Sequence, residues 1–125
     1  MKKTSSKGNS ELLTQAAIAA IEDKKGYDIV MLDMTEVDGA ICDYFIICHG
    51  TSDTQVNAIA DSVERGVKTD VHENPWHVEG KENCTWVLLD YSNVVVHIFE
   101  KATRDFYKLE DLWADAKKTL IREGY

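Results

Sequence analysis

The segment WVLLDYSNVVVHIFE, Trp86 to Glu100, constrains the fold of this 125-residue chain more than any other stretch. Two apolar runs of strand length flank the polar pair Ser92-Asn93, which is typical of an antiparallel hairpin with a two-residue turn. In that register the opposed residues are Tyr91 with Val94, Asp90 with Val95, Leu88 with His97, and Trp86 with Phe99. The hairpin therefore predicts a β-sheet with cover on at least one face.

The two faces of this hairpin differ chemically, because side chains alternate along each strand. One face is aliphatic and requires a helix over it; it holds Val87, Leu89, Val94, Val96 and Ile98, with Tyr91 at the turn. The other face holds Trp86, Leu88, Asp90, Val95, His97 and Phe99. Its mixture of aromatic, acidic and imidazole groups is typical of a recognition surface. A second buried face, with His97 bonded to Asp90 or to a loop carbonyl, fits the pattern equally.

The rest of the chain predicts helices and strands within one domain. We expect a helix over 11–25, strands over 27–34 and 43–49, a helix from Ser52 to before Pro75, a short strand over 76–80, then the hairpin and a largely helical segment over 102–124. This order favours an α/β (α+β) fold, a mixed β-sheet of about five strands flanked by helices. Residues 1–10 are predicted to be a disordered polar tail and residues 11–125 a single domain.

The charge and composition exclude some classes of protein. A net charge of −8 argues against direct wrapping of nucleic acid and favours basic partners, although it serves equally well to keep the protein soluble. No apolar run approaches the roughly 18–20 residues of a membrane helix, and the first residues lack the apolar stretch of a secretory signal. Three cysteines without framework spacing fit a reducing compartment. We expect a cytoplasmic protein without membrane contact.

No catalytic or metal site is predicted. Nucleotidyl transfer needs a Gly-Ser turn followed by two carboxylates on a strand to hold Mg²⁺. The segment 50–52 could supply the turn, but it fits a simple helix cap equally well. No Asp-x-Asp follows this segment. Glu36 and Asp38 have that spacing, but they precede the turn and lie in a predicted loop. Histidines and cysteines lack metal-site spacing, and the neighbours Cys48 and His49 point to opposite faces of a strand. We therefore expect a non-enzymatic protein with no cofactor and no metal.

Three segments in this order resemble the Iojap family, the bacterial ribosomal silencing factors (RsfS): CDYFIICHGTSDTQVNAIADSV, then WHVEG with WVLLDYSNVVVHIF, then RDFYKLEDLW. The resemblance runs from about Glu11 to Asp115. It implies a fold similar to that of nucleotidyltransferases without their catalytic carboxylates, in agreement with the missing acid pair.

The resemblance also implies a function. Members of the family bind the large ribosomal subunit through a basic protein of its subunit-joining face, the fourteenth of the bacterial large-subunit series. Docking there blocks the small subunit and represses translation when nutrients are scarce. Little direct RNA contact is expected, and a homodimer of the free protein, through a sheet edge or the hairpin, is compatible with the sequence. Two alternatives stay open: a large-subunit assembly factor, as implied by organellar relatives, and a nucleotidyltransferase-type enzyme.

The resemblance maps the partner contact onto the hairpin. It carries over to Trp86, Asp90 and Tyr91, and the full predicted set adds Glu79, Leu88, Asn93 and His97. Tryptophan and tyrosine are frequent anchors of interfaces, and an adjacent aspartate can meet lysine or arginine on a basic partner. Where the family usually has Gly-Asp, this chain has Ser92-Asn93, which removes an acid and the permissive glycine. We expect Asn93 to tolerate a positive φ and preserve the turn.

Overall fold

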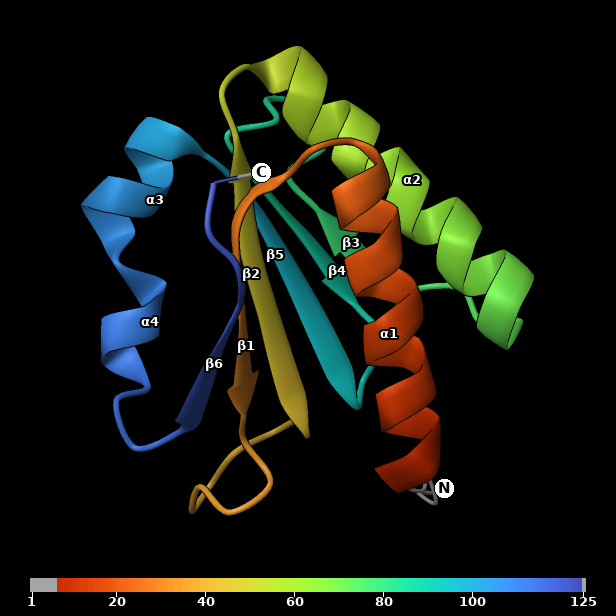
Figure 1. The fold of residues 1–125 in the computed structure, drawn as a ribbon, viewed down its shortest axis with the longest axis vertical. Helices are drawn as coiled ribbons and strands as arrows, with labels where there is room; N and C mark the ends of the chain where they lie inside the picture. The colour runs from red at the N-terminus through yellow and green to blue at the C-terminus, as the bar shows by residue number, and fades with distance from the viewer. Residues whose placement is uncertain (1–6, 125) are drawn as a thin grey trace.

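A computed structural model describes the backbone of residues 7–124 and the side chains from Asn9 onward (Figure 1). The elements are α1 (Lys7–Asp23), β1 (Tyr27–Asp33), β2 (Tyr44–Gly50), α2 (Asp53–Val71), β3 (His77–Glu79), β4 (Trp86–Asp90), β5 (Val94–Glu100), α3 (Lys101–Tyr107), α4 (Leu109–Leu112) and β6 (Lys117–Arg122). The predicted α+β class with a mixed sheet flanked by helices is confirmed.

The predicted boundary between tail and domain falls inside helix α1, which begins at Lys7. Residues 1–6 lie outside the described part of the chain. Residues 7–10 form the first turns of α1 rather than a disordered segment. The reason is tertiary: Ser10 is fully buried, donates a hydrogen bond to Asp43 (2.7 Å) and accepts one from Asn93 (2.8 Å), which ties the start of α1 to the hairpin turn.

The six strands lie in the order β3-β4-β5-β2-β1-β6. Neighbours are antiparallel except β2 and β5, which pair in parallel with Tyr44 opposite Val94. Every residue of β2 is buried, as expected for a central strand covered on both faces. The edges differ: β3 has only three residues, whereas β6 is longer and carries Lys117, Lys118 and Arg122.

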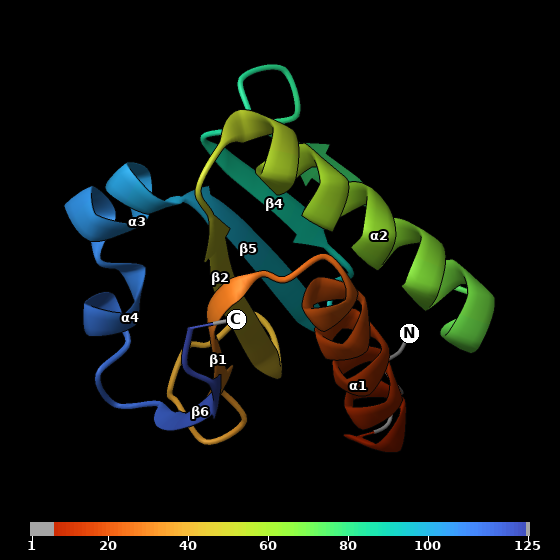
Figure 2. The ribbon, with the colours of Figure 1, turned by 45° about the horizontal axis from the view of Figure 1, so that its top comes forward.

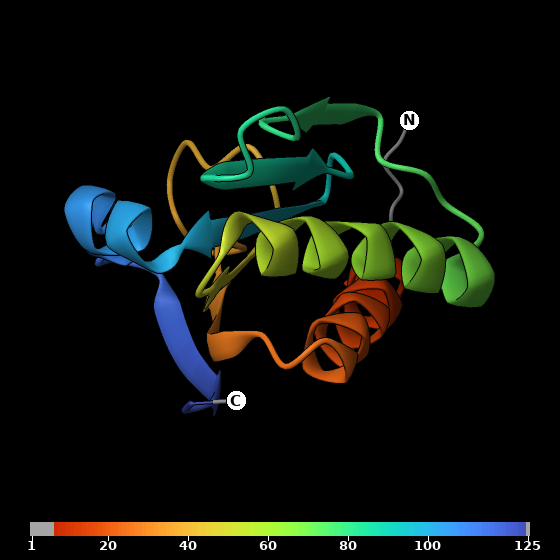
Figure 3. The ribbon, with the colours of Figure 1, turned by 90° about the horizontal axis from the view of Figure 1, so that it is seen from above.

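Helices α1 and α2 cover one face of the sheet, and Figures 2 and 3 show them together on one side, away from α3 and α4. The apolar residues at helical spacing on both helices are buried: Leu13, Ala16, Ala17, Ala20 and Ile21 on α1, and Val56, Ile59, Ala60, Val63 and Val67 on α2. Ser52 caps α2 by accepting the Gln55 N–H (3.1 Å), and the Gln55 side chain accepts the Thr51 N–H (2.8 Å).

Among the residues that the structure describes, no helix is long and apolar enough to cross a membrane.

The C-terminal segment departs from the prediction of a helix over most of 102–124. Helix α3 ends at Tyr107, and Lys108 after it has a left-handed φ of 48°. After the short helix α4, β6 pairs with β1 as a sixth strand. Thr119 and Ile121 are β-branched, which favours a strand. The edge of β1 supplies backbone hydrogen-bond partners for this strand. The predicted length of the helix is therefore wrong, because pairing with a distant strand overrides local propensity.

The apolar residues of this C-terminal segment are therefore only partly buried. The structure buries Leu109 and Ala116, half-buries Trp113, and leaves Phe106, Leu112 and Leu120 exposed. The buried members pack on the face of the sheet opposite α1 and α2, together with Phe45 and Phe99. This second face is therefore covered by a short segment rather than by long helices.

Candidate functional site

The β4–β5 hairpin has the predicted register, with Trp86 opposite Phe99 and Asp90 opposite Val95. Its turn departs in one detail: the positive φ (76°) belongs to Ser92 and not to Asn93. The Asp90 carboxylate accepts the Ser92 N–H (2.7 Å) and so stabilises this turn.

One face of the hairpin, here called the closed face, lies under α1 and α2. Its members are Val87, Leu89, Tyr91, Val94, Val96 and Ile98, all buried. Tyr91 has an exposed fraction of only 4%, and its hydroxyl has no hydrogen-bond partner among the described residues. Burial raises the pKa of this phenol. Tyr91 therefore has almost no surface to present, and we leave it out of the proposed contact.

The opposite face, here called the open face, holds Trp86, Leu88, Asp90, Val95, His97 and Phe99. Exposure is graded across it: Val95, His97 and Phe99 on β5 are buried, whereas Trp86, Leu88 and Asp90 on β4 are half-buried. This face is thus partly accessible along β4 and buried along β5.

His97 supports Trp86 from beneath. The Trp86 indole N–H donates to His97 Nδ1 (3.1 Å), which replaces the Asp90 or loop-carbonyl partner expected from the sequence. Phe45 packs edge-on against the imidazole, with ring centroids 4.8 Å apart. Burial lowers the pKa of His97 to about 4, so the ring is neutral near pH 7 and its Nδ1 can accept the hydrogen bond from the indole N–H. His97 is therefore a buried strut that orients Trp86.

Acidic side chains flank the exposed strand of the open face. Glu79 on β3 is directly opposite Leu88, so both side chains project to the same side of the sheet. Glu79 is exposed and pairs with His77 (2.6 Å), which itself lies opposite Asp90. The arrangement is an apolar centre with carboxylates at its rim, which complements a basic and partly apolar partner.

Two aromatic residues of α3 extend this apolar centre. The Tyr107 ring lies 5.1 Å from Trp86, and the Phe106 ring lies 5.0 Å from Tyr107. Phe106 is 78% exposed and Tyr107 51%. We call Trp86, Leu88, Phe106 and Tyr107 the aromatic surface. The sequence prediction missed the α3 part of it, although consecutive aromatics on a helix cannot both face inward, and this signal was available.

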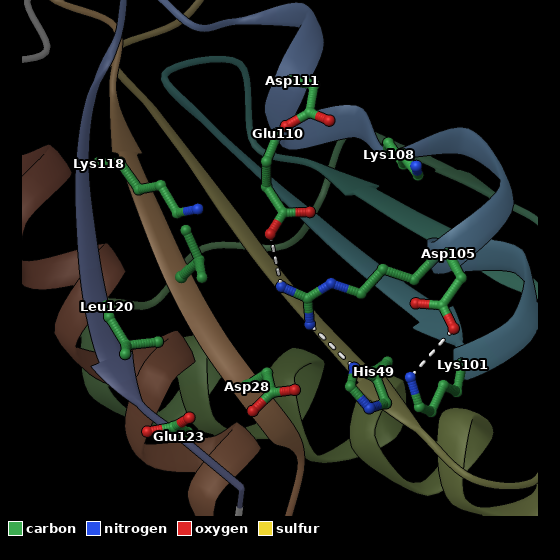
Figure 4. A pocket seen from close by; sticks show the side chains of 12 residues that line it. Asp28, His49, Lys101, Asp105, Lys108, Glu110, Asp111, Lys118, Leu120 and Glu123 are labelled. Atoms are coloured by element: carbon green, nitrogen blue, oxygen red, sulfur yellow. Dashed lines mark hydrogen bonds and ion pairs between the residues drawn. The ribbon is translucent and has the colours of Figure 1, made fainter.

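A cleft of about 500 Å³ lies between α3, α4, β1, β2 and β6 (Figure 4). Arg104 is buried in its wall; it donates to Glu110 (2.8 Å) and to His49 Nδ1 (2.9 Å). Burial and then the neighbouring Arg104 lower the pKa of His49, which keeps the imidazole neutral and able to accept. Lys101 pairs with Asp105 at the rim (3.0 Å).

The residues considered for catalysis are not assembled into a site. Ser52 caps α2, while Glu36 and Asp38 are exposed in the loop between β1 and β2. Within the described part of the chain, no group of three or more His, Cys, Asp or Glu residues is placed to hold a metal ion. Burial raises the pKa of the Cys42 and Cys48 thiols to about 12, so neither is an activated nucleophile.

The fold and this surface define a small mixed-sheet domain whose most developed feature is an exposed aromatic face with an acidic rim. The family model described as ribosomal silencing factor during starvation (RsfS) matches residues 7–124. The chain belongs to this family.

Individual relatives agree with that assignment. The Bacillus subtilis protein named ribosomal silencing factor RsfS is 45% identical over 86% of this chain and 90% of its own length. A crystal structure of a Chromobacterium violaceum protein is similar with a TM-score of 0.79 and 35% identity, covering 91% of this chain and 93% of that one. A mouse protein named mitochondrial assembly of ribosomal large subunit protein 1 is 33% identical over 57% of this chain and 32% of its own length.

Proposed function

We propose that this protein silences ribosomes by steric block. It binds the large ribosomal subunit through a basic protein, the fourteenth of the large-subunit series, on the face that joins the small subunit. Occupying that face prevents association of the subunits and represses translation under nutrient limitation in the cytoplasm. The observation that carries the proposal is the open face itself, where Trp86 and Leu88 are half-accessible and Glu79 and Asp90 lie beside Leu88, in a chain of the RsfS family.

The geometry of Trp86 suits an interface anchor. Its ring is held by the His97 hydrogen bond and by contacts with Phe99 and Tyr107, at centroid distances of 4.8 and 5.1 Å. A side chain that is already ordered loses little conformational entropy when a partner covers it. Tryptophan also buries a large area, which is why it is frequent among the residues that dominate binding energy.

The acidic residues orient the basic partner and raise the rate at which the two proteins meet. Glu79 and Asp90 lie beside the apolar centre, and the net charge of −8 favours approach to a basic protein. We assign direct contact to Trp86, Leu88, Asp90 and Glu79. The remaining predicted residues act as supports: His97 is buried under Trp86, Tyr91 is buried under the helices, and Asn93 binds Ser10.

Steric block requires no bond to be made or broken, so the proposed mechanism is non-enzymatic and uses no cofactor or metal. A domain of this size on the joining surface suffices, provided that it binds the large subunit more tightly than the small subunit does when nutrients are limited. Self-association of the free protein stays a prediction from the sequence.

Co-sedimentation with purified ribosomal particles tests this function. The tagged protein is mixed separately with large subunits, small subunits and joined ribosomes, and the pellets are quantified. We expect binding to large subunits alone, and a lower fraction of joined ribosomes when the protein is added before the two subunits are mixed. Equal binding to small subunits or to joined ribosomes would contradict the proposal.

A role in large-subunit assembly is a second candidate, because the mouse relative carries assembly of the mitochondrial large subunit in its name. Both roles use the same surface and differ in the particle that is bound. Binding to immature large particles but not to mature large subunits, in the same sedimentation experiment, would favour assembly over silencing.

A further inference from the structure

Helix α3 is short and has little of its own to hold it on the sheet. It contains seven residues, and among the described residues of this helix only Arg104 is buried. Isolated helices of this length are unstable in water, so tertiary contacts must fix its position. The single buried side chain of α3 is therefore the main determinant of where its exposed residues lie.

Arg104 joins α3 to three other elements. Its Nη2 donates to Glu110 on α4 (2.8 Å), and its Nη1 donates to His49 on β2 (2.9 Å) and to the Tyr27 carbonyl on β1 (3.4 Å). Figure 4 shows Glu110 and His49 on either side of the guanidinium, with one dashed line from each of them to it. The side chains of the ion pair are only 8% and 17% exposed, so solvent screens the attraction weakly.

The same residue also closes the end of α3. The Arg104 carbonyl accepts the N–H of Lys108 (2.9 Å), which takes the left-handed conformation that ends the helix. Phe106 and Tyr107 lie between these two residues. Their positions are therefore set on one side by the buried guanidinium and on the other by the helix end.

Tyr107 in turn lies against Trp86, 5.1 Å between ring centroids, and Phe106 lies against Tyr107. The rings make a continuous path from β4 to α3, with more than half of each α3 side chain exposed. Because Tyr107 and Phe106 continue the apolar surface that begins at Trp86, a partner that covers Trp86 also covers them. The basic ribosomal protein can therefore bury α3 and β4 together, with Glu79 and Asp90 at the far rim.

We infer that Arg104 is a positioning residue for the ribosome contact: by tying α3 to α4, β1 and β2, it holds Tyr107 and Phe106 beside Trp86, so that α3 and β4 form one contact surface for the basic partner. This inference rests on the proposed function. It assigns Arg104 no contact with the partner, because the guanidinium is buried and already bonded to protein groups.

A double-mutant cycle on large-subunit affinity tests the inference. The variants are Arg104→Met, the pair Phe106→Ala with Tyr107→Ala, and all three changes combined. We expect Arg104→Met and the aromatic pair each to weaken binding about tenfold, and the combined variant to bind no more weakly than the aromatic pair alone. A purely structural role for Arg104 predicts instead a further tenfold loss in the combined variant, and that result would overturn the inference.

Two further variants keep the test decisive. Should Arg104→Met melt below the assay temperature, Glu110→Gln replaces it in the cycle, because it removes the charge of the partner while retaining its shape. Lys101→Met is the matched control, since Lys101 is a cation on the same helix with an exposed partner, Asp105. Its affinity should equal that of the wild type; a tenfold loss would mean that charge on α3, rather than positioning, matters.

Failure of the inference and failure of the proposed function give different results. A wild-type protein that does not bind large subunits removes the proposed function itself. A wild type that binds, loses binding on Trp86→Ala and keeps it on Arg104→Met retains the function and removes the inference.

Discussion

The closed and open faces of the β4–β5 hairpin are built from alternate residues of the same two strands, yet they differ in almost every physical respect. The closed face is aliphatic and wholly buried beneath α1 and α2, with the Tyr91 hydroxyl as its one polar group. The open face buries an imidazole against aromatic rings and leaves a tryptophan half-accessible. The comparison teaches that one strand can contribute to the core with one side while its other side leaves a tryptophan and a leucine accessible.

The largest expected effect is on the closed face. Replacing Leu89 with alanine removes a fully buried side chain from the core under α1 and α2, and we expect the free energy of unfolding to fall by about 2–5 kcal/mol. Urea denaturation followed by circular dichroism measures this loss. At a temperature where the variant is folded, its affinity for large subunits should match that of the wild type. A variant that keeps its stability and loses affinity would reverse the assigned roles of the faces.

The second prediction concerns pH and the open face. The pKa of His97 falls from 6.5 in the unfolded chain to about 4 when burial disfavours its charged form. The unfolded state therefore takes up a proton below about pH 6.5, while the folded state does so only near pH 4. The stability contributed by neutral His97 is intact above this window and lost within it as pH falls, by about 3 kcal/mol in total.

Urea midpoints at about pH 7 and pH 4.5 measure that loss. The matched variant is His97→Gln, which cannot titrate, so its stability should fall less between the two pH values than that of the wild type. Carboxylates and His49 titrate in both proteins and cancel in the comparison. Equal losses in the two proteins would show that His97 is not held neutral by the open face.

The third prediction is Trp86→Ala. We expect the affinity for large subunits to fall by about 2 kcal/mol, as for other interface anchors, while the fold persists. Trp76 provides a matched control, because it is an exposed tryptophan that precedes β3 and is outside the aromatic surface. Trp76→Ala should bind like the wild type in co-sedimentation. Unfolding of Trp86→Ala, seen by circular dichroism, would instead make Trp86 a core residue.

The smallest effect is expected from Tyr91→Phe. This change removes a buried hydroxyl that has no partner among the described residues, so the free energy of unfolding should stay the same or rise by up to about 1 kcal/mol. Affinity should not change, because Tyr91 belongs to the closed face. A clear loss of affinity would show that Tyr91 reaches the partner, as the family resemblance implies, and that the hairpin turn opens on binding.

The parts of the fold that follow local rules were predictable from the sequence. Strand alternation and turn length determine the register of the hairpin, and helical spacing determines the inward stripe of α2. The strand β6 was not predictable in this way, since its partner β1 lies more than 80 residues earlier: Asp33 pairs with Lys117. Local propensity contains no information about such a pairing.

The candidate site shows the same division. Alternation placed Trp86 and Leu88 on the open face, and the family resemblance indicated that this face meets a partner. Neither could show that β5 is buried on both faces, because burial on this side depends on Phe45 and on the segment after α3. The ion pair of Arg104 and Glu110 was equally hidden, since it requires the bend between α3 and α4.

The two edges of the sheet have a consequence for behaviour at high concentration. Strand β3 offers three residues, too few to template a long ladder, and β6 carries Lys117, Lys118 and Arg122. If two copies paired antiparallel along β6 about its midpoint, Lys117 of each would face Arg122 of the other, and the like charges would repel. Short or cationic edges are a recognised protection against fibril-like stacking. The exposed apolar side chains of the aromatic surface are thus separate from the unpaired backbone groups of the β6 edge. An apolar surface can therefore stay exposed without promoting cross-β aggregation.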